Sequence, residues 1–333
     1  KINSFDEFEP DIGFAGDGII FFDNQRNILK FDKRSNLIWK KNFYKKNQVK
    51  QNPILFFSNN KNYLIVADTI GKIYKVDIIS GELIWQKNNP IPFYSQIKIF
   101  DNKIFVVDFE NVLHCFALNN GDSLWKVKTE KSFIRSQKKS SIVIANDIVF
   151  FNNSIGDITA VNTKSGDIIW QTSTQPNTIY QESYSFKNSD LVISSNSIIF
   201  SNNKNEFFLL DIETGNIQWK QNINSYVRPT IIDNLIFTIS SHGFLVIIDK
   251  KKGNIIRSTD IFDLFKKKKR KKILPIGFIV AKNHIYLSTS NGNLLLIDYV
   301  IGKTKAAYKI DRDTISSPII VGKNFYLAKN NTI

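Results

Sequence analysis

The chain has 333 residues, enough for two ordinary domains or for one large all-β domain, and its 27 Phe and 11 Tyr favour strands over helices. Its one cysteine, Cys115, excludes an intrachain disulfide and a thiolate metal cluster, and no apolar stretch has the length of a membrane span. The formal net charge of +15 makes anionic partners worth considering, although most of the lysines are spread singly along the chain.

One segment recurs along the chain. Three clear copies run from Asp77 to Trp85, from Asn162 to Trp170 and from Asp211 to Trp219. In each copy, Ser or Thr stands three residues after the first residue, and Gly follows it directly. Including four weaker copies, the last position of the repeat is occupied by Trp39, Trp85, Trp125, Trp170, Trp219, Arg257 and Ala306. These markers are separated by 38 to 49 residues, which is about the 40–45 residues of a four-stranded propeller blade.

The residue types explain why each copy is a hairpin. Asp or Asn can bond its own backbone two residues on, and Gly supplies a positive φ, so the segment predicts a turn between two strands. A second hairpin precedes each copy, for example residues 97–107, 142–151 and 230–238, where a polar pair interrupts a β-branched and aromatic run.

Eight upstream hairpins can be counted, the last at residues 318–327, but only seven downstream ones. We therefore predict an all-β, eight-bladed β-propeller of four-stranded antiparallel blades, with seven blades as the alternative. It forms a single domain over residues 1–333, whose eighth blade is incomplete at residues 314–333.

The pattern Leu/Val-Asp-x-x-Ser/Thr-Gly-x-x-x-Trp resembles the repeat of the PQQ-like propellers, whose Trp packs between neighbouring blades. That family includes quinoprotein alcohol dehydrogenases and non-catalytic members of the BamB type. The dehydrogenases are longer and carry adjacent cysteines and calcium ligands, whereas this chain has one Cys, scattered Arg residues and Asp residues mainly in repeat turns. We expect no catalytic, cofactor-binding or metal-binding residues, and a PQQ-dependent oxidoreductase remains the alternative.

The BamB-type resemblance implies a periplasmic scaffold that supports the assembly and insertion of outer-membrane β-barrel proteins. Its partners would be a BamA-like insertase and nascent outer-membrane proteins. Because the chain begins at Lys1 and contains no Met, we interpret it as a mature or trimmed fragment. The implied location is the inner face of the outer membrane, held by an N-terminal lipid outside the fragment.

The same resemblance indicates where a protein partner would bind. In that family, loops between blades contact the insertase, and one of them carries an apolar–Arg step. The segment of Phe133, Ile134 and Arg135, which follows Trp125, is similar to that apolar–Arg step. An exposed triplet of an aromatic, an aliphatic and an Arg side chain is also typical of binding hot spots. Tyr226 and Arg228 form a second candidate; packing of both loops against adjacent blades is the alternative.

A run of consecutive basic residues is the strongest charge feature. It consists of Lys266, Lys267, Lys268, Lys269, Arg270, Lys271 and Lys272. Such a run indicates contact with anionic lipid headgroups or another polyanion, or else a solvated loop. No aromatic residues are interleaved with it, so we expect no nucleic-acid partner.

Overall fold

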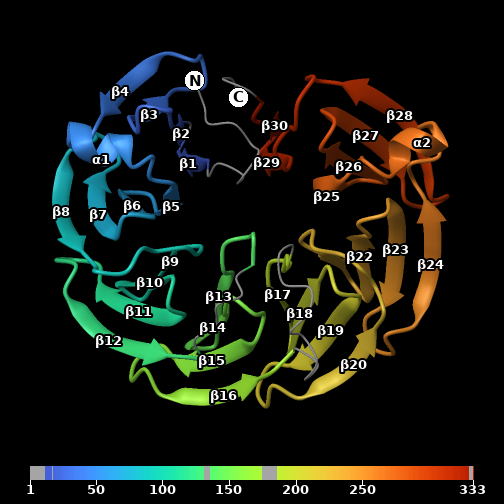
Figure 1. The fold of residues 1–333 in the computed structure, drawn as a ribbon, viewed down its shortest axis with the longest axis horizontal. Helices are drawn as coiled ribbons and strands as arrows, with labels where there is room; N and C mark the ends of the chain where they lie inside the picture. The colour runs from blue at the N-terminus through green and yellow to red at the C-terminus, as the bar shows by residue number, and fades with distance from the viewer. Residues whose placement is uncertain (1–11, 17, 131–135, 175–185, 330–332) are drawn as a thin grey trace. The chain divides into compact units, whose positions relative to one another are not determined.

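The computed structural model describes residues 12–16, 18–130, 136–174, 186–329 and 333. The described strands form seven four-stranded antiparallel sheets and a final two-stranded one, each from consecutive strands (Figure 1). We call these sheets blades 1 to 8 in chain order. This succession confirms the predicted all-β class with eight blades, of which the eighth has two described strands, β29 and β30.

The chain divides into two compact units, and blades 1 to 4 belong to the first. Its strands are β1 (Gly13–Ala15), β2 (Gly18–Phe22), β3 (Ile28–Phe31), β4 (Leu37–Lys41), β5 (Leu55–Asn59), β6 (Tyr63–Asp68), β7 (Lys72–Asp77), β8 (Leu83–Asn88), β9 (Lys98–Phe100), β10 (Lys103–Val107), β11 (Val112–Ala117), β12 (Ser123–Lys128), β13 (Ile142–Ala145), β14 (Ile148–Asn152), β15 (Ile158–Asn162) and β16 (Ile168–Thr172). The short helix α1 (Lys46–Lys50) joins blades 1 and 2.

Blades 5 to 8 belong to the second unit. Its strands are β17 (Val192–Ser194), β18 (Ser197–Asn202), β19 (Glu206–Asp211), β20 (Ile217–Gln221), β21 (Thr230–Ile232), β22 (Leu235–Ile239), β23 (Phe244–Asp249), β24 (Ile255–Asp260), β25 (Pro275–Ala281), β26 (His284–Thr289), β27 (Asn293–Asp298), β28 (Lys303–Lys309), β29 (Ile319–Val321) and β30 (Asn324–Tyr326). The helix α2 (Lys267–Arg270) lies between blades 6 and 7.

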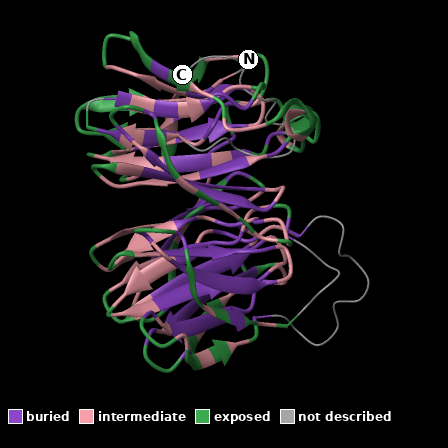
Figure 2. Cartoon of the chain, turned by 90° about the vertical axis from the view of Figure 1, so that its left-hand side faces the viewer, coloured by how far each residue is buried: buried purple, intermediate pink, exposed green. Residues whose placement is uncertain are grey.

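In blades 3 and 6, the second and third strands are apolar on both faces because a neighbouring blade of the same unit covers each face. In β10, Ile104 and Val106 pack in a core shared with blade 2, while Phe105 and Val107 pack in a core shared with blade 4. Successive side chains of a strand point to opposite faces, so one apolar run supplies both cores. Figure 2 shows the buried residues concentrated in the strands, whereas most of the turns are exposed.

The repeat tryptophans join consecutive blades. The indole N–H of Trp39 in blade 1 donates to the carbonyl of Ile78 in the turn of blade 2, at 3.2 Å, and the ring covers Gly81. Trp85 repeats the contact on Leu118 and Gly121 of blade 3. The predicted packing of the Trp between blades is therefore present within each unit, and the rings of Trp39, Trp85, Trp125 and Trp219 lie on Gly81, Gly121, Gly166 and Gly253.

Arg257 replaces the Trp of blade 6 in the same role. Its Nη1 donates to the carbonyl of Tyr299, at 3.1 Å, and to that of Val300, both in the repeat turn of blade 7. The Cδ of Arg257 lies so near Gly302 of that turn that a Cβ added to this glycine would be 3.3 Å from it. The guanidinium thus occupies the place of the indole, whereas Ala306 in blade 7 has no side chain that could reach so far.

Each four-stranded blade has a β-bulge at the same place in its outermost strand pair. The register between the third and fourth strands shifts by one residue immediately before the Trp position, for example at Ile38, Ile84 and Ile169. The extra residue is unpaired, which breaks the alternation of the strand. As a result, both residues before the Trp become exposed in blades 1, 2 and 4.

Candidate functional site

The hairpin between the second and third strands of blades 1 to 7 carries a polar residue at one equivalent position. These residues are Asp23, Asp68, Asp108, Asn153, Asn202, Ser240 and Thr289. Each side-chain oxygen accepts a hydrogen bond from a backbone N–H two or four residues further along. Asp68 Oδ1, for instance, accepts from Ile70 N at 2.9 Å and from Lys72 N at 2.8 Å. These oxygens therefore stabilise the turns.

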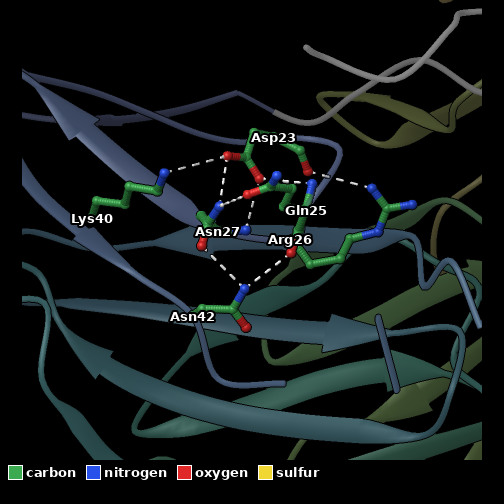
Figure 3. A network of polar contacts seen from close by, with 6 residues as sticks. All are labelled: Asp23, Gln25, Arg26, Asn27, Lys40 and Asn42. Atoms are coloured by element: carbon green, nitrogen blue, oxygen red, sulfur yellow. Dashed lines mark hydrogen bonds and ion pairs between the residues drawn. The ribbon is translucent and has the colours of Figure 1, made fainter. Parts of the chain in front are cut away.

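Blade 1 shows how such a turn is completed (Figure 3). Asp23 Oδ1 accepts from the backbone N–H groups of Gln25 and Asn27, and its Oδ2 accepts from Asn27 Nδ2 at 2.7 Å. Arg26 is 1% exposed, and its Nη1 donates to the carbonyl of Asp23 at 3.3 Å. Burial lowers the pKa of this guanidinium. Arg26 thus stabilises the hairpin from inside and is closed to an anionic ligand.

A buried polar cluster lies where the chain passes from blade 1 to blade 2. The hydroxyl of Tyr44 donates to Asp68 Oδ2 at 2.6 Å and lies 3.2 Å from the hydroxyl of Tyr74. Lys72 Nζ donates to the carbonyl of Phe43 at 2.7 Å and lies 4.5 Å from the centre of the Tyr44 ring. Burial raises the pKa of Asp68, of Tyr44 and of Tyr74. Every member contacts another, so the cluster holds the blade connection together.

Blade 3 contains the free thiol and one of the three histidines. Cys115 is fully buried in the core between blades 3 and 4, and burial raises the pKa of its thiol to about 12. His114 Nε2 lies 2.7 Å from Asp108 Oδ2, with both side chains buried. The thiol is therefore a core residue rather than a nucleophile.

The carboxylates within the described ranges do not form the set of oxygen ligands that a quinoprotein calcium site needs. Calcium takes six to eight oxygen ligands, usually from several acidic side chains together. Across the described ranges, no three His, Cys, Asp or Glu side chains are grouped so that they could hold a metal ion. The donor set that the structure describes therefore does not fit a quinone–calcium centre.

Neither α1 nor α2, the helices described, is long or apolar enough to cross a membrane.

Only the second of the two predicted partner loops lies within the described residues. Phe133, Ile134 and Arg135 fall outside the described residues. Tyr226 is 8% exposed and packs in the core between blades 6 and 7; its burial raises the pKa of its hydroxyl to about 12. Arg228 is exposed. Of this second pair, only Arg228 therefore offers its side chain to a partner.

The basic run forms a structured connection between β24 and β25. Its six lysines are exposed, whereas Arg270 is half-buried and bonded to its own loop. In the sequence, these seven basic residues are equivalent. In the structure, Arg270 anchors the loop, whereas the six lysine side chains are exposed to solvent.

The fourth strands carry a surface that sequence reasoning missed. Each is an edge strand, and apolar residues before the Trp position are exposed, such as Leu37 (51%), Ile38 (50%) and Ile256 (57%). The remaining exposed residues of this kind are Leu83, Ile84, Leu124, Ile168, Ile169, Ile217 and Ile255. The signal was two adjacent apolar residues before the Trp, which violates strand alternation and indicates a bulge.

The stacked four-stranded blades, with Trp rings lying on the repeat turns, define a β-propeller of the PQQ-like class. A protein-family model for the outer membrane protein assembly factor BamB matches residues 24–259. The chain therefore belongs to the BamB family. A search of curated proteins gave no match.

Solved structures show the same fold at low sequence identity. BamB from Moraxella catarrhalis is similar with a TM-score of 0.75 and 12% identity, covering 95% of this chain and 92% of that one. Sqt1 of Saccharomyces cerevisiae has a TM-score of 0.71 and 10% identity, covering 94% and 89%. Quinohemoprotein alcohol dehydrogenase from Comamonas testosteroni has a TM-score of 0.67 and 11% identity, covering 96% of this chain but 70% of the enzyme.

Proposed function

We propose that this chain is a non-catalytic periplasmic scaffold at the inner face of the outer membrane, which supports the assembly and insertion of β-barrel proteins. The match of the BamB family model over residues 24–259 is the main support. The nearly complete mutual coverage with a BamB structure also supports it, whereas the chain spans only 70% of the dehydrogenase.

Two surfaces suit protein partners. A BamA-like insertase would bind the connections between blades through Phe133, Ile134, Arg135 and Arg228, because Arg and aromatic side chains are common in binding hot spots. Nascent outer-membrane strands would use the edges of the fourth strands. An extended segment could add there by main-chain hydrogen bonds, with its apolar side chains against residues such as Ile38 and Ile256.

Co-purification with a BamA-like insertase tests the scaffold and its first surface together. We expect the double variant Ile134→Glu with Arg135→Glu to reduce the recovered insertase at least tenfold, about 1.4 kcal/mol or more. The matched control is Ile79→Glu with Arg34→Glu, which places the same charges on exposed turns elsewhere. Equal recovery from both double variants would refute the assignment of the loop, and no recovery with the wild type would refute the scaffold function.

A PQQ-dependent oxidoreductase is the second candidate, favoured by the likeness to quinohemoprotein alcohol dehydrogenases. Calorimetric titration of the protein with PQQ and Ca²⁺ distinguishes the two. The scaffold hypothesis expects no heat of binding, and a stoichiometric exothermic signal would favour the enzyme.

A further inference from the structure

The connection from Phe262 to Leu274 in the second unit, the basic loop, concentrates positive charge on a structured segment. It runs from the end of β24 to the start of β25 and contains α2. The side chains of Lys266, Lys267, Lys268, Lys269, Lys271 and Lys272 are all exposed. Asp263 is the one acidic residue of the loop. Six ammonium groups within seven positions create a local positive potential far above that of the scattered lysines elsewhere.

Arg270 holds this loop in shape. Its Nε donates to the carbonyl of Phe265 at 2.7 Å, its Nη2 to the carbonyl of Asp263 at 2.7 Å, and its Nη1 to Asp260 Oδ2 at 2.6 Å. Buried Phe262 and Ile273 fix the two ends in the core between blades 6 and 7. The loop is thus a preorganised platform, and a preorganised surface loses less conformational entropy when it binds.

Apolar side chains flank the lysines on both sides. Leu264 is 54% exposed and Leu274 is 37% exposed. The aromatic residues of the loop face inward: Phe262 is buried, and the rings of Phe262 and Phe265 pack edge to face with centroids 5.9 Å apart. Exposed leucines beside lysines suit the boundary between lipid headgroups and acyl chains, whereas single-stranded nucleic acid would need exposed aromatic platforms.

From this arrangement we propose that the basic loop is a docking site for an anionic bilayer surface. The six lysines contact lipid phosphate groups, Leu264 and Leu274 enter the interface, and Arg270 positions the loop without touching lipid. This contact is independent of the proposed scaffold function. It would orient the second unit on a membrane whatever protein partners the chain has.

Vesicle flotation tests the proposal with the intact chain. Wild type should float with vesicles of about one third phosphatidylglycerol in phosphatidylcholine and should stay unbound with phosphatidylcholine alone. Each lysine near an anionic surface contributes about fivefold in partitioning, so Lys267, Lys268, Lys269 and Lys271 changed together to Ser should reduce binding by at least a hundredfold. The matched control replaces four exposed lysines elsewhere, at positions 61, 126, 128 and 251. It should bind at least ten times more tightly than the loop variant.

Three outcomes would overturn the proposal. The first is a loop variant that floats like wild type, and the second is a control variant that loses as much binding, which assigns the effect to net charge alone. The third is a single-stranded oligonucleotide that binds the loop while the vesicles do not. Free phosphate ions at millimolar concentration should not displace the vesicles, because a single anion engages only part of the six-lysine surface. Circular dichroism melts of both variants check that each remains folded.

The leucines provide a separate readout. Leu264→Ser with Leu274→Ser retains every charge, so binding at low salt should fall by about tenfold or less. The binding that survives at high salt, where screening weakens the lysines, should be lost. If the double variant binds like wild type at both salt concentrations, the leucines do not enter the interface, and a purely electrostatic contact replaces this part of the proposal.

Discussion

A methyl group added at Gly253 should separate the two reasons why the repeat turn contains glycine. The residue has a φ of +72°, and a Cβ there would lie 2.7 Å from both Cγ and Cδ2 of Trp219. The positive φ costs an alanine about 1 kcal/mol, and forcing the methyl against the indole costs about 1–3 kcal/mol more. We therefore expect Gly253→Ala to lower the free energy of unfolding by about 2–4 kcal/mol.

A double-mutant cycle isolates the contribution of the ring. Trp219→Ala removes the indole, whose Nε1 donates to the carbonyl of Lys250 at 2.9 Å, and should cost about 2–4 kcal/mol because the side chain is only half-buried. In that background, Gly253→Ala should cost only the φ contribution of about 1 kcal/mol. The coupling between the two positions should therefore be about 1–3 kcal/mol.

Urea unfolding followed by far-ultraviolet circular dichroism is the assay, since removing a Trp would change a fluorescence signal. Gly322→Ala is the matched control: its φ is +61° and no atom lies within 4 Å of its added Cβ, so it should cost about 1 kcal/mol. If Gly253→Ala has the same effect with and without Trp219, the ring does not press on the turn. The explanation of the blade contact would then be wrong.

Three further outcomes follow from burial and hydrogen bonding. Cys115 should resist thiol reagents at about pH 8 until denaturant is added, because burial raises its pKa to about 12; rapid labelling of the native protein would contradict this. Burial also raises the pKa of Asp68, so the folded state retains a proton that the unfolded chain releases near about pH 4, and stability falls as pH rises through the folded pKa. Asp68→Asn should therefore show a smaller fall in melting temperature than wild type between about pH 4 and 7. Identical pH profiles of the two proteins would contradict a raised pKa of Asp68. Arg257→Ala should cost about 1–2 kcal/mol in urea unfolding by removing its bonds to the turn of blade 7, whereas an Ala306→Gly control should cost about 1 kcal/mol or less.

The repeat turns were predictable because their chemistry is local. Asp77 Oδ1 accepts from the backbone N–H groups of Ile79 and Ser80, as the spacing of Asp and Ser indicated. The partner of each Trp was beyond prediction from the residues alone, since Trp39 contacts Gly81 across 42 positions of the chain. The PQQ-like resemblance supplied that relation, and the structure identified the acceptor carbonyl.

Features that depend on which side of a backbone faces the core could not be predicted. Tyr226 and Arg228 share a connection and have similar hot-spot chemistry, yet one is buried and the other exposed. Lys75 looks like a surface lysine in the sequence, but it is 5% exposed and donates to the carbonyl of Leu118 at 3.1 Å, beside the Trp85 indole. A period-2 pattern cannot reveal a lysine whose Nζ reaches a polar acceptor in the next blade.

The change from Trp219 to Arg257 to Ala306 along the second unit implies a graded cooperativity. In a repeat protein, stability is approximately the sum of intrinsic repeat terms and nearest-neighbour couplings. The coupling after blade 5 uses an indole stacked on Gly253, the next uses a guanidinium on two carbonyls, and the marker side chain of blade 7 is a methyl group. Native-state hydrogen exchange should therefore be slowest in blade 6 and faster toward blade 8, so that this end of the unit opens as a separate foldon before the rest.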